Sequence, residues 1–375
     1  MGGDRAGPPA RGAPRLRPGT PHRSAGARLG GRSPMSSETR RPRWSVVAPQ
    51  GTNLELAGLD GAGAWRTLTD TAALARTCGY DTLWLEDRTD TLPRRELQPV
   101  TECWTALGAL AATVPDIGLG LLSAIPPHRN ALLLAKQAAG VDIISGGRFT
   151  LGLSTSPKLP EQAAAGTARP GAGTGPAVAE TIGALRALWS GARTTVDGDT
   201  VTLTGAHAVP VPVQPRLPMA IRADAAHPDA AGLLPEAAVR ECAVVQWQGE
   251  PADVARAVAG FGLRREKLGL EPGRTRHALL AECRVFEDQV SRDRWLSTPH
   301  VVAFWSHHPD LLARRSLYGT VEQVLELASR YAAAGVTEFV LWFRDYPGTE
   351  SLRRVAEEIA PRLPALPRSA FPEEV

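Results

Sequence analysis

The feature that most constrains this chain is a regular alternation between short apolar runs and longer amphipathic stretches. Such alternation is typical of βα units, in which a buried parallel strand is followed by a helix that covers it. Several runs are almost continuously apolar, as expected for strands buried on both faces. Eight strands are predicted, beginning near Trp44, Thr82, Ile117, Phe149, Met219, Ala243, Leu279 and Thr337. Eight such units predict a closed (β/α)8 TIM barrel of the α/β class, for which about 250 residues suffice.

The intervals between the strands indicate the helices and two insertions. Helices are predicted over residues 65–78, 99–112, 130–144, 177–189, 251–268 and 321–334. Gly79, Gly146 and Gly335 follow three of these helices, where glycine is a common cap. The fourth and fifth strands start 70 residues apart (149 to 219) and the seventh and eighth 58 apart (279 to 337), which predicts insertions after strands 4 and 7. A doubly wound open sheet is the alternative, but no GxGxxG follows the first strand.

Charge divides the chain into an extension and a main domain. Residues 1–43 hold ten Arg, no Lys and two acids, a net charge of +8, so within the total of +3 the rest carries −5. The extension is rich in Arg, Pro and Gly and cannot bury enough apolar surface to fold, which predicts disorder. It lacks the apolar core of a secretory signal, and Met35 is an alternative start. The predicted division is 1–43 extension, 44–363 barrel and 364–375 tail.

Partners and compartment follow from charge, hydropathy and cysteine spacing. A mildly acidic main domain argues against nucleic acid, although the basic extension keeps a nucleic-acid or membrane arm as an alternative. The chain contains no run of about 18 consecutive apolar residues, so no membrane span is predicted. The four cysteines lie far apart without a CxxC pair, which argues against disulfides and a zinc site and favours a reducing cytoplasm.

Active sites of (β/α) barrels gather where the strands end. Candidate polar residues at these positions are Gln50, Asp87, Arg88, Ser123, Ser154, Thr155, Arg222, Asp224, Gln246, Arg344 and Asp345. The cluster 86–88 (EDR) is suited to substrate binding or proton transfer, or equally to a salt bridge at the rim. Arg344 and Asp345 are interpreted as a structural pair that caps the last strand.

Histidines give a weaker signal. His307 and His308 are adjacent, so their side chains point in different directions, and no third metal ligand is evident. Exposure to solvent is the favoured interpretation, and no metal is predicted. His128 follows the third strand, where a cofactor contact and a plain loop role are equally good interpretations.

Five ordered motifs carry a family resemblance. Residues 133–149 (LLAKQAAGVDIISGGRF) are the most specific, and residues 99–107 (PVTECWTAL), 187–191 (ALWSG), 212–215 (PVQP) and 338–347 (EFVLWFRDYP) agree with them. Together these segments resemble the luciferase-like monooxygenases, which are oxidoreductases that depend on a flavin or on the deazaflavin F-420. The resemblance covers residues 44–363 and is strongest to the F-420-dependent branch.

The departures from this family pattern fall where a cofactor would bind. After the second strand the family has Asp-His, and this chain has Asp87-Arg88. The turn after the fourth strand reads Ser154-Thr155-Ser156-Pro157 in place of a Gly-Ala-Gly-Trp type turn. After the fifth strand a phosphate-binding Gly-Gly-x-Gly loop is replaced by residues 222–225 (RADA). Glycines let backbone N–H groups approach a phosphate, whereas Asp224 would repel one and Arg222 could pair with it.

The resemblance implies a flavin- or F-420-dependent oxidoreductase or monooxygenase that acts on a small organic substrate, with FMN or F-420 as cofactor. Carried over residue by residue, it implies catalytic roles for Asp87 and Glu161 and cofactor binding by Ser123, Ala124, Ser154 and Arg222. It also implies a non-proline cis peptide at Ser123–Ala124, and it allows a homodimer. The alternative is a degenerate barrel without the usual cofactor that serves as a binding or partner subunit.

Overall fold

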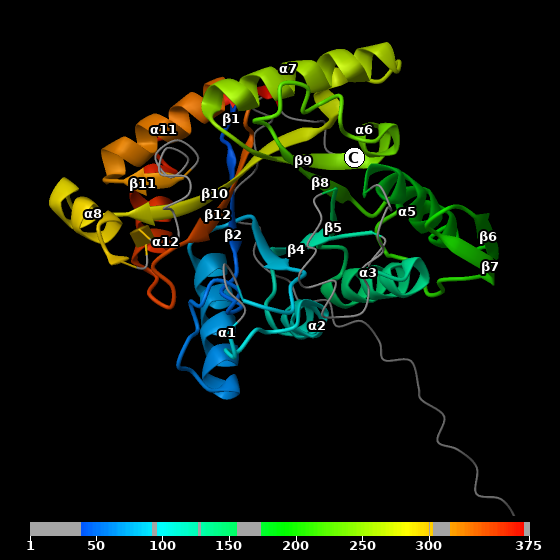
Figure 1. Ribbon diagram of the computed structural model, residues 1–375, viewed down its shortest axis with the longest axis horizontal. Coiled ribbons are helices and arrows are strands. Elements are labelled where there is room, and N and C mark those ends of the chain that lie inside the picture. Colours follow the sequence, from blue (N-terminus) through cyan, green and yellow to red (C-terminus); the bar gives the residue numbers. More distant parts are fainter. Residues whose placement is uncertain are drawn as a thin grey trace, which may run out of the picture. The chain divides into compact units, whose positions relative to one another are not determined.

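Eight parallel strands close into a ring in the computed structural model (Figure 1). The structure describes residues 39–91, 96–126, 129–155, 174–299, 301–302 and 316–370. The barrel strands are β2 (Arg43–Val47), β3 (Thr82–Glu86), β4 (Gly118–Ala124), β5 (Phe149–Ser154), β8 (Met219–Asp224), β9 (Cys242–Gln248), β10 (Arg276–Val285) and β12 (Glu338–Phe343). All eight predicted strands are therefore confirmed.

Pairing of β9 with β10 and of β12 with β2 closes the ring. Every neighbouring pair is parallel, and the strand order follows the chain. This closure confirms the TIM barrel and excludes the doubly wound sheet, which would leave two open edges. A short strand, β11 (Leu317–Gly319), adds to the carboxyl end of β10 and was not predicted.

Side chains fill the barrel interior. Alternate strand residues form an inner apolar cluster, separate from the larger core between the sheet and the helices. The inner cluster contains Val47, Trp84, Leu122, Ala220, Val244, Ala278, Leu280 and Val340. Gly120 makes room for Trp84, because a Cβ at Gly120 would lie 2.2 Å from the Trp84 ring. The interior is thus a packed core, as is usual for this fold.

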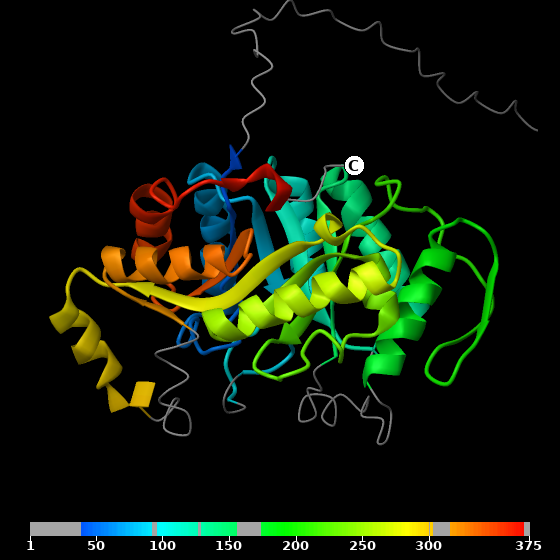
Figure 2. The ribbon, with the colours of Figure 1, turned by 90° about the horizontal axis from the view of Figure 1, so that it is seen from above.

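Helices cover the outside of the ring. They are α1 (Gly61–Thr77), α2 (Cys103–Thr113), α3 (Ala131–Ser145), α5 (Thr174–Leu188), α6 (Glu236–Glu241), α7 (Pro251–Lys267), α8 (Gln289–Leu296), α11 (Val321–Ala333) and α12 (Glu350–Arg354), which continues as a π-helical turn, Val355–Ile359. Figure 2 shows α7 and α11 along the same side of the barrel, where they contact each other. The six predicted helices are confirmed.

Local sequence explains where several helices begin and end. Asp60 and Asn130 accept hydrogen bonds from backbone N–H groups in the first turns of α1 and α3, as capping side chains do. Gly146 ends α3 at φ +68°, a left-handed conformation that glycine adopts at no steric cost. Gly79 and Gly335 also have positive φ values, at +79° and +93°. The three predicted glycine caps are confirmed.

Two long connections separate barrel strands. Between β5 and β8 lie α5 and an antiparallel hairpin of β6 (Thr194–Asp197) and β7 (Thr202–Ala206). Between β10 and β12 lie α8, β11 and α11. Both connections also contain residues outside the described ranges. The positions of the two insertions stay predictions.

Two short strands near the ends of the described chain pair with each other. β1 (Thr39–Arg40) pairs antiparallel with β13 (Leu366–Pro367), although both lie outside the predicted 44–363 domain. The domain bounds stay a prediction. All four cysteines are free thiols in this structure. Among the helices in the described ranges, none is long and apolar enough to cross a membrane.

Candidate functional site

The carboxyl ends of the barrel strands carry polar residues that continue the inner face. Glu86, Arg222 and Gln246 each lie two residues beyond a member of the inner cluster, namely Trp84, Ala220 and Val244. Since successive strand side chains alternate between faces, all three point into the mouth of the barrel. The mouth is therefore the candidate site.

Glu86 supplies a buried carboxylate to the mouth. It is 1% exposed, and its Oε2 accepts a hydrogen bond of 2.8 Å from Thr52 Oγ1. Arg88 Nε lies 3.7 Å from its Oε1. The rim salt bridge that was one interpretation of the cluster 86–88 is therefore present, between Glu86 and Arg88. Gln50 holds the backbone here, because its amide donates to Glu86 O (3.1 Å) and to Thr101 O (3.2 Å).

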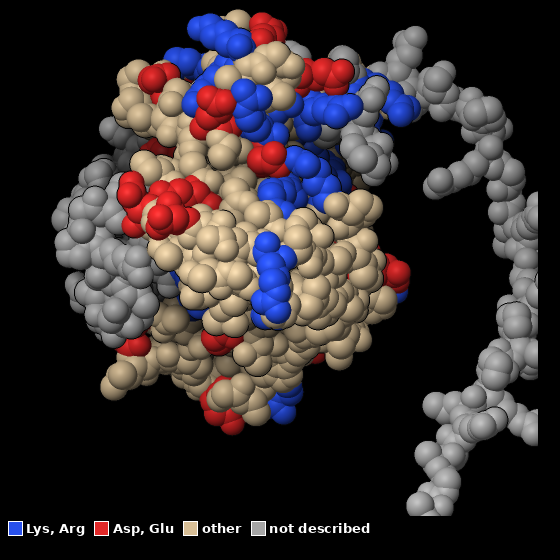
Figure 3. Space-filling view, turned by 90° about the vertical axis from the view of Figure 1, so that its right-hand side faces the viewer, with Lys and Arg blue, Asp and Glu red and all other residues tan. Residues whose placement is uncertain are grey.

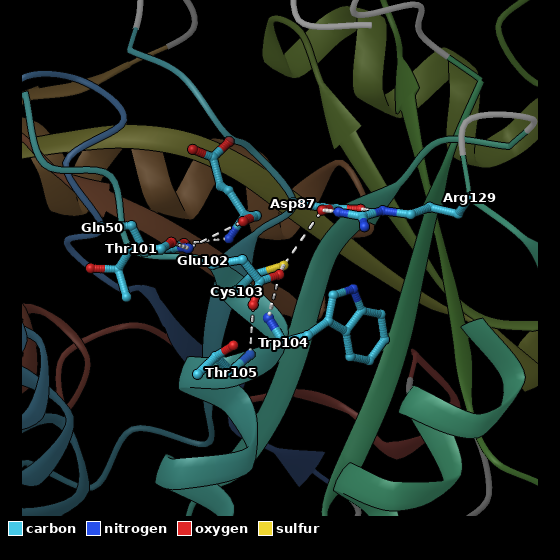
Figure 4. Close-up of polar contacts among 9 residues, drawn as sticks. Gln50, Asp87, Thr101, Glu102, Cys103, Trp104, Thr105 and Arg129 are labelled. Carbon is cyan, nitrogen blue, oxygen red and sulfur yellow. Dashed lines mark hydrogen bonds and ion pairs between the residues drawn. The ribbon is translucent and has the colours of Figure 1, made fainter. Parts of the chain in front are cut away.

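Asp87 points away from the mouth, as the residue after an inward-facing one should. Arg129 forms a two-pronged ion pair with it, in which Nε donates to Oδ2 over 2.9 Å and Nη2 contacts Oδ1 (Figure 4). Cys103 Sγ at the start of α2 lies 3.5 Å from Asp87 Oδ1. Burial acts to lower the pKa of Arg129, but the hydrogen bonds and charge of Asp87 outweigh it and raise that pKa. Asp87 therefore ties β3 to the starts of α2 and α3.

Three neighbouring strands place Ser154, Arg222 and Gln246 in one register row. Ser154 pairs with Arg222, and Arg222 pairs with Gln246. Arg222 donates from Nε (3.0 Å) and Nη2 (2.7 Å) to Oε1 of Gln248. Burial lowers the pKa of Arg222, with the nearby charge of Glu86 acting to raise it and that of Arg88 to lower it further. Charges from opposite parts of the ring thus converge in the mouth.

Gln246 is the unusual member of this row. Its side chain is fully buried, at 0% exposure. Within the described part of the chain, neither its Oε1 nor its Nε2 has a hydrogen-bond partner. Most buried polar groups in folded proteins are paired, so this amide needs an explanation.

The loop after β8 is organised around Asp224. Its exposed carboxylate accepts a hydrogen bond of 2.9 Å from the backbone N–H of Ala226. That N–H is consequently engaged by an acid of the chain itself. The loop offers less to an anion than a glycine turn with free amides would.

Strand β4 corrects one expectation and places two predicted residues. The non-proline cis peptide is Leu122–Ser123, one bond before the expected Ser123–Ala124. Ser123 and Ala124 are both fully buried, and the pairing of β4 with β5 shifts register just here. Ala124 belongs to the outer core between sheet and helices, while Leu122 belongs to the inner cluster. The register shift explains how the strand changes its face.

Other candidates lie at the rim or outside the described residues. Arg344 Nε donates to Glu282 Oε2 on β10 over 3.0 Å, and Asp345 accepts from Ser351 N over 2.8 Å. These contacts support a structural role for both. Glu161, His128, His307, His308, Ser156 and Pro157 lie outside the described ranges. Within those ranges, no cluster of three His, Cys, Asp or Glu residues could hold a metal.

The structure brings together Ser154, Arg222 and Gln246 and separates Asp87 from them. Sequence position marked Gln246, and it marked Glu86 as part of the cluster 86–88, but it did not mark Gln248. The signal for these residues was the alternation along β9 and β3, where Val244-x-Gln246-x-Gln248 and Trp84-x-Glu86 share a face.

Comparison of the sequence with known proteins supports membership of one family. A sequence model of the luciferase-like monooxygenases matches residues 47–340. The uncharacterized protein Rv0953c of Mycobacterium tuberculosis is 29% identical over 175 residues, which are 42% of this chain and 61% of that protein. The 5,10-methylenetetrahydromethanopterin reductase of Methanolobus tindarius is 30% identical over 135 residues, 36% of this chain and 38% of that protein. The match thus spans less than two thirds of either relative.

Solved structures share the fold. One is an F-420-dependent secondary alcohol dehydrogenase in complex with an F-420–acetone adduct, which has a TM-score of 0.68 at 17% sequence identity. The alignment covers 87% of this chain and 98% of the dehydrogenase chain. Another is the oxygenating constituent of 3,6-diketocamphane monooxygenase from Pseudomonas putida in complex with FMN, which has a TM-score of 0.70 at 14% sequence identity. The alignment covers 87% of this chain and 99% of the monooxygenase chain. These neighbours carry F-420 or FMN, so the comparisons do not favour a cofactor-free barrel. The family match extends over most of the chain and agrees with the five motifs and the closed barrel: this protein belongs to the luciferase-like monooxygenase family.

Proposed function

We propose that this protein is an oxidoreductase that holds FMN or F-420 in the mouth of its barrel and acts on a small organic substrate. Family membership supports the class of reaction, and the two similar solved structures described above hold F-420 or FMN. When bound, such a cofactor supplies hydride transfer or monooxygenation, which no protein side chain can perform. Neither nucleic acid nor membrane is proposed as a partner, and a cytoplasmic location stays a prediction.

The match of residues 47–340 to the luciferase-like monooxygenases carries the proposal, and the polar groups of the barrel mouth agree with it. FMN and F-420 both contain a flat ring system with carbonyl oxygens and a ring N–H along one edge. The mouth offers polar groups to such an edge, namely the Gln246 amide and the Arg222 guanidinium, with Ser154 in the same row. The apolar inner cluster lies below them and suits the flat faces of a ring. The residues of the mouth therefore fit the ring.

In this proposal the phosphate of the cofactor is not held by the backbone amides of a glycine loop. Asp224 engages the N–H of Ala226, so backbone amides contribute less than in a glycine loop. Arg256, whose Nη2 donates to Ala225 O over 3.4 Å, is a described cation beside this loop, and an Arg guanidinium can pair with a phosphate. We expect the phosphate to contribute less to affinity here than the ring does.

The chain's own residues would orient reactants and hold protons. Glu86 is buried beside Arg88 and Thr52, so it can hold or accept a proton next to the mouth. The packed inner cluster excludes water from below the ring, which strengthens every polar contact there. Catalytic roles for Asp87 and Glu161 stay proposals, as does cofactor contact by Ser123, Ala124 and Ser154.

Cofactor titration of the full chain tests the proposal. FMN, F-420 and riboflavin are titrated separately, with cofactor fluorescence as the readout and circular dichroism to establish that the protein is folded. Saturable binding of FMN or F-420 is expected, and riboflavin should bind within about tenfold of FMN if the phosphate contributes little. A folded protein that binds none of the three would refute the redox function.

A second copy of this chain is the proposed partner. The sides of α3 and of the segment 209–213 carry exposed apolar residues, namely Leu133, Ile144, Val209, Val211 and Val213. Lys136 Nζ donates to Val209 O over 3.2 Å, so the two segments lie together. Figure 3 shows a broad area with few charges on the side where α3 and the β6–β7 hairpin lie in Figure 1. Contiguous exposed apolar surface is typical of an association site.

A further inference from the structure

The side chain of Gln246 is fully buried in the barrel mouth, and its hydrogen-bonding capacity is unused. It shares the inner face of β9 with Val244, a member of the inner cluster. Oε1 and Nε2 both have no partner among the described residues. The neighbour that could serve it is engaged elsewhere, because Arg222 directs Nε and Nη2 to Gln248.

An amide in this state is costly for the fold alone. A leucine would fill similar space in an apolar barrel without leaving a donor and an acceptor unsatisfied. Such groups are typical of binding sites, where the missing partner arrives with the ligand. A ligand that enters the mouth beside β9 would supply the partner that this donor and acceptor lack.

The chemistry of a carboxamide selects the ligand group. Its oxygen only accepts a hydrogen bond and its NH2 only donates, so full satisfaction needs a donor and an acceptor side by side. Phosphate and carboxylate groups only accept and would leave Oε1 without a partner. A ring imide, in which C=O stands next to N–H, offers both in one plane.

We propose that Gln246 is the residue that recognises the imide edge of the cofactor ring and sets the ring's orientation in the mouth. Oε1 accepts from the ring N–H, and Nε2 donates to the neighbouring carbonyl. Arg222, one strand away in the same register, is placed to serve the second carbonyl with Nη1, which makes no hydrogen bond to the described residues. This inference rests on the proposed function, because it assigns a residue to the same cofactor.

The test combines a protein change with a ligand change. Gln246→Leu removes the amide and keeps the bulk, and Gln137→Leu is the matched control. Gln137 lies on α3, outside the barrel, and its Oε1 is also buried without a partner. The full-length variants are titrated with FMN or F-420, whichever the natural chain binds, and with the same cofactor methylated at the imide nitrogen.

We expect Gln246→Leu to weaken binding by about 10- to 100-fold and Gln137→Leu to leave it unchanged. Methylation should weaken binding to the natural chain by a similar factor and add little to the loss in Gln246→Leu, because both changes remove the same hydrogen bond. Equal binding by Gln246→Leu and the natural chain, or equal effects of methylation on both, would overturn the inference while leaving the proposed function intact. Failure of the natural chain to bind either cofactor would instead refute the proposed function.

Thermal unfolding without cofactor separates recognition from a structural role. If Gln246 serves a ligand, Gln246→Leu should unfold at the same temperature as the natural chain or higher, because an unsatisfied polar group is gone. A fall larger than that of Gln137→Leu would show that the amide stabilises the fold and would overturn the assignment.

Discussion

Asp87 is a residue whose position in the chain and whose contacts point to different roles. It follows β3 at the catalytic end of the barrel, yet its side chain is 5% exposed and is bound by Arg129. An ion pair of this kind holds Arg129, which lies just before α3, against the end of β3. The structure thus supports a positioning role for Asp87 beside a site formed by its neighbour Glu86.

Removing the Asp87 carboxylate tests that role. Asp87→Asn should lower the free energy of unfolding by about 2 kcal/mol, because it leaves the partly buried Arg129 without its counter-charge. Asp116→Asn is the control, since it breaks the exposed pair with Arg76 and should cost less than about 0.5 kcal/mol. Both are measured by urea unfolding. Equal losses in the two variants would argue against a structural ion pair.

His277 makes stability depend on pH. It is buried on β10, and Trp247 Nε1 donates to its Nδ1 over 3.1 Å. Burial, with a smaller contribution from Arg265, lowers its pKa from 6.5 to about 4. As pH falls below 6.5 the unfolded chain binds a proton that the folded chain refuses until about pH 4, so stability decreases over this window.

The expected loss is about 2 kcal/mol between about pH 7 and about pH 5. Urea unfolding at both values measures it. His277→Gln keeps an acceptor for Trp247 but cannot titrate, so its stability should fall less over the same range. Parallel behaviour of the two proteins would show that other groups cause the pH dependence.

At the scale of elements, the strands are held so closely that glycine is needed within them. A Cβ at Gly152 on β5 would lie 2.0 Å from Leu121 O on β4, and this oxygen belongs to the backbone. Neither strand can move away without losing ladder hydrogen bonds. The glycine is therefore required by the approach of β5 to β4 beside the register shift.

Alanine at two glycines tests this reading. Gly152→Ala should destabilise the protein by more than about 3 kcal/mol or prevent folding. Gly183→Ala in α5 meets no atom within 4 Å and should stabilise by about 0.5 to 1 kcal/mol, because alanine favours the helix. Thermal unfolding followed by circular dichroism measures both. A mild effect at Gly152 would contradict the close packing of the strands.

For the whole molecule, the exposed apolar face of α3 and 209–213 predicts self-association. Leu133→Glu should convert a dimer to a monomer, because it places a charge in the contact. Leu263→Glu on α7 is the control, since Leu263 is similarly exposed, 59% against 54%, but lies outside this face. Size-exclusion chromatography with light scattering gives the mass. A natural chain that is monomeric at high concentration would refute the proposal.

The sequence by itself determined the barrel. Apolar runs such as the one that begins at Phe149 can be satisfied only when both faces are covered, and glycines such as Gly146 end helices through a conformation that other residues avoid. These signals are local, so they can be read without coordinates. The family motifs are local as well, which is why they identified the same fold.

Only the tertiary structure decided which polar residues share the mouth. Asp87 and Glu86 are adjacent in sequence, but strand alternation sends one to Arg129 and the other into the barrel. Ser154, Arg222 and Gln246 are far apart in sequence and become neighbours through strand register. A site of this kind is set by pairing between strands, and pairing involves residues that no local pattern connects.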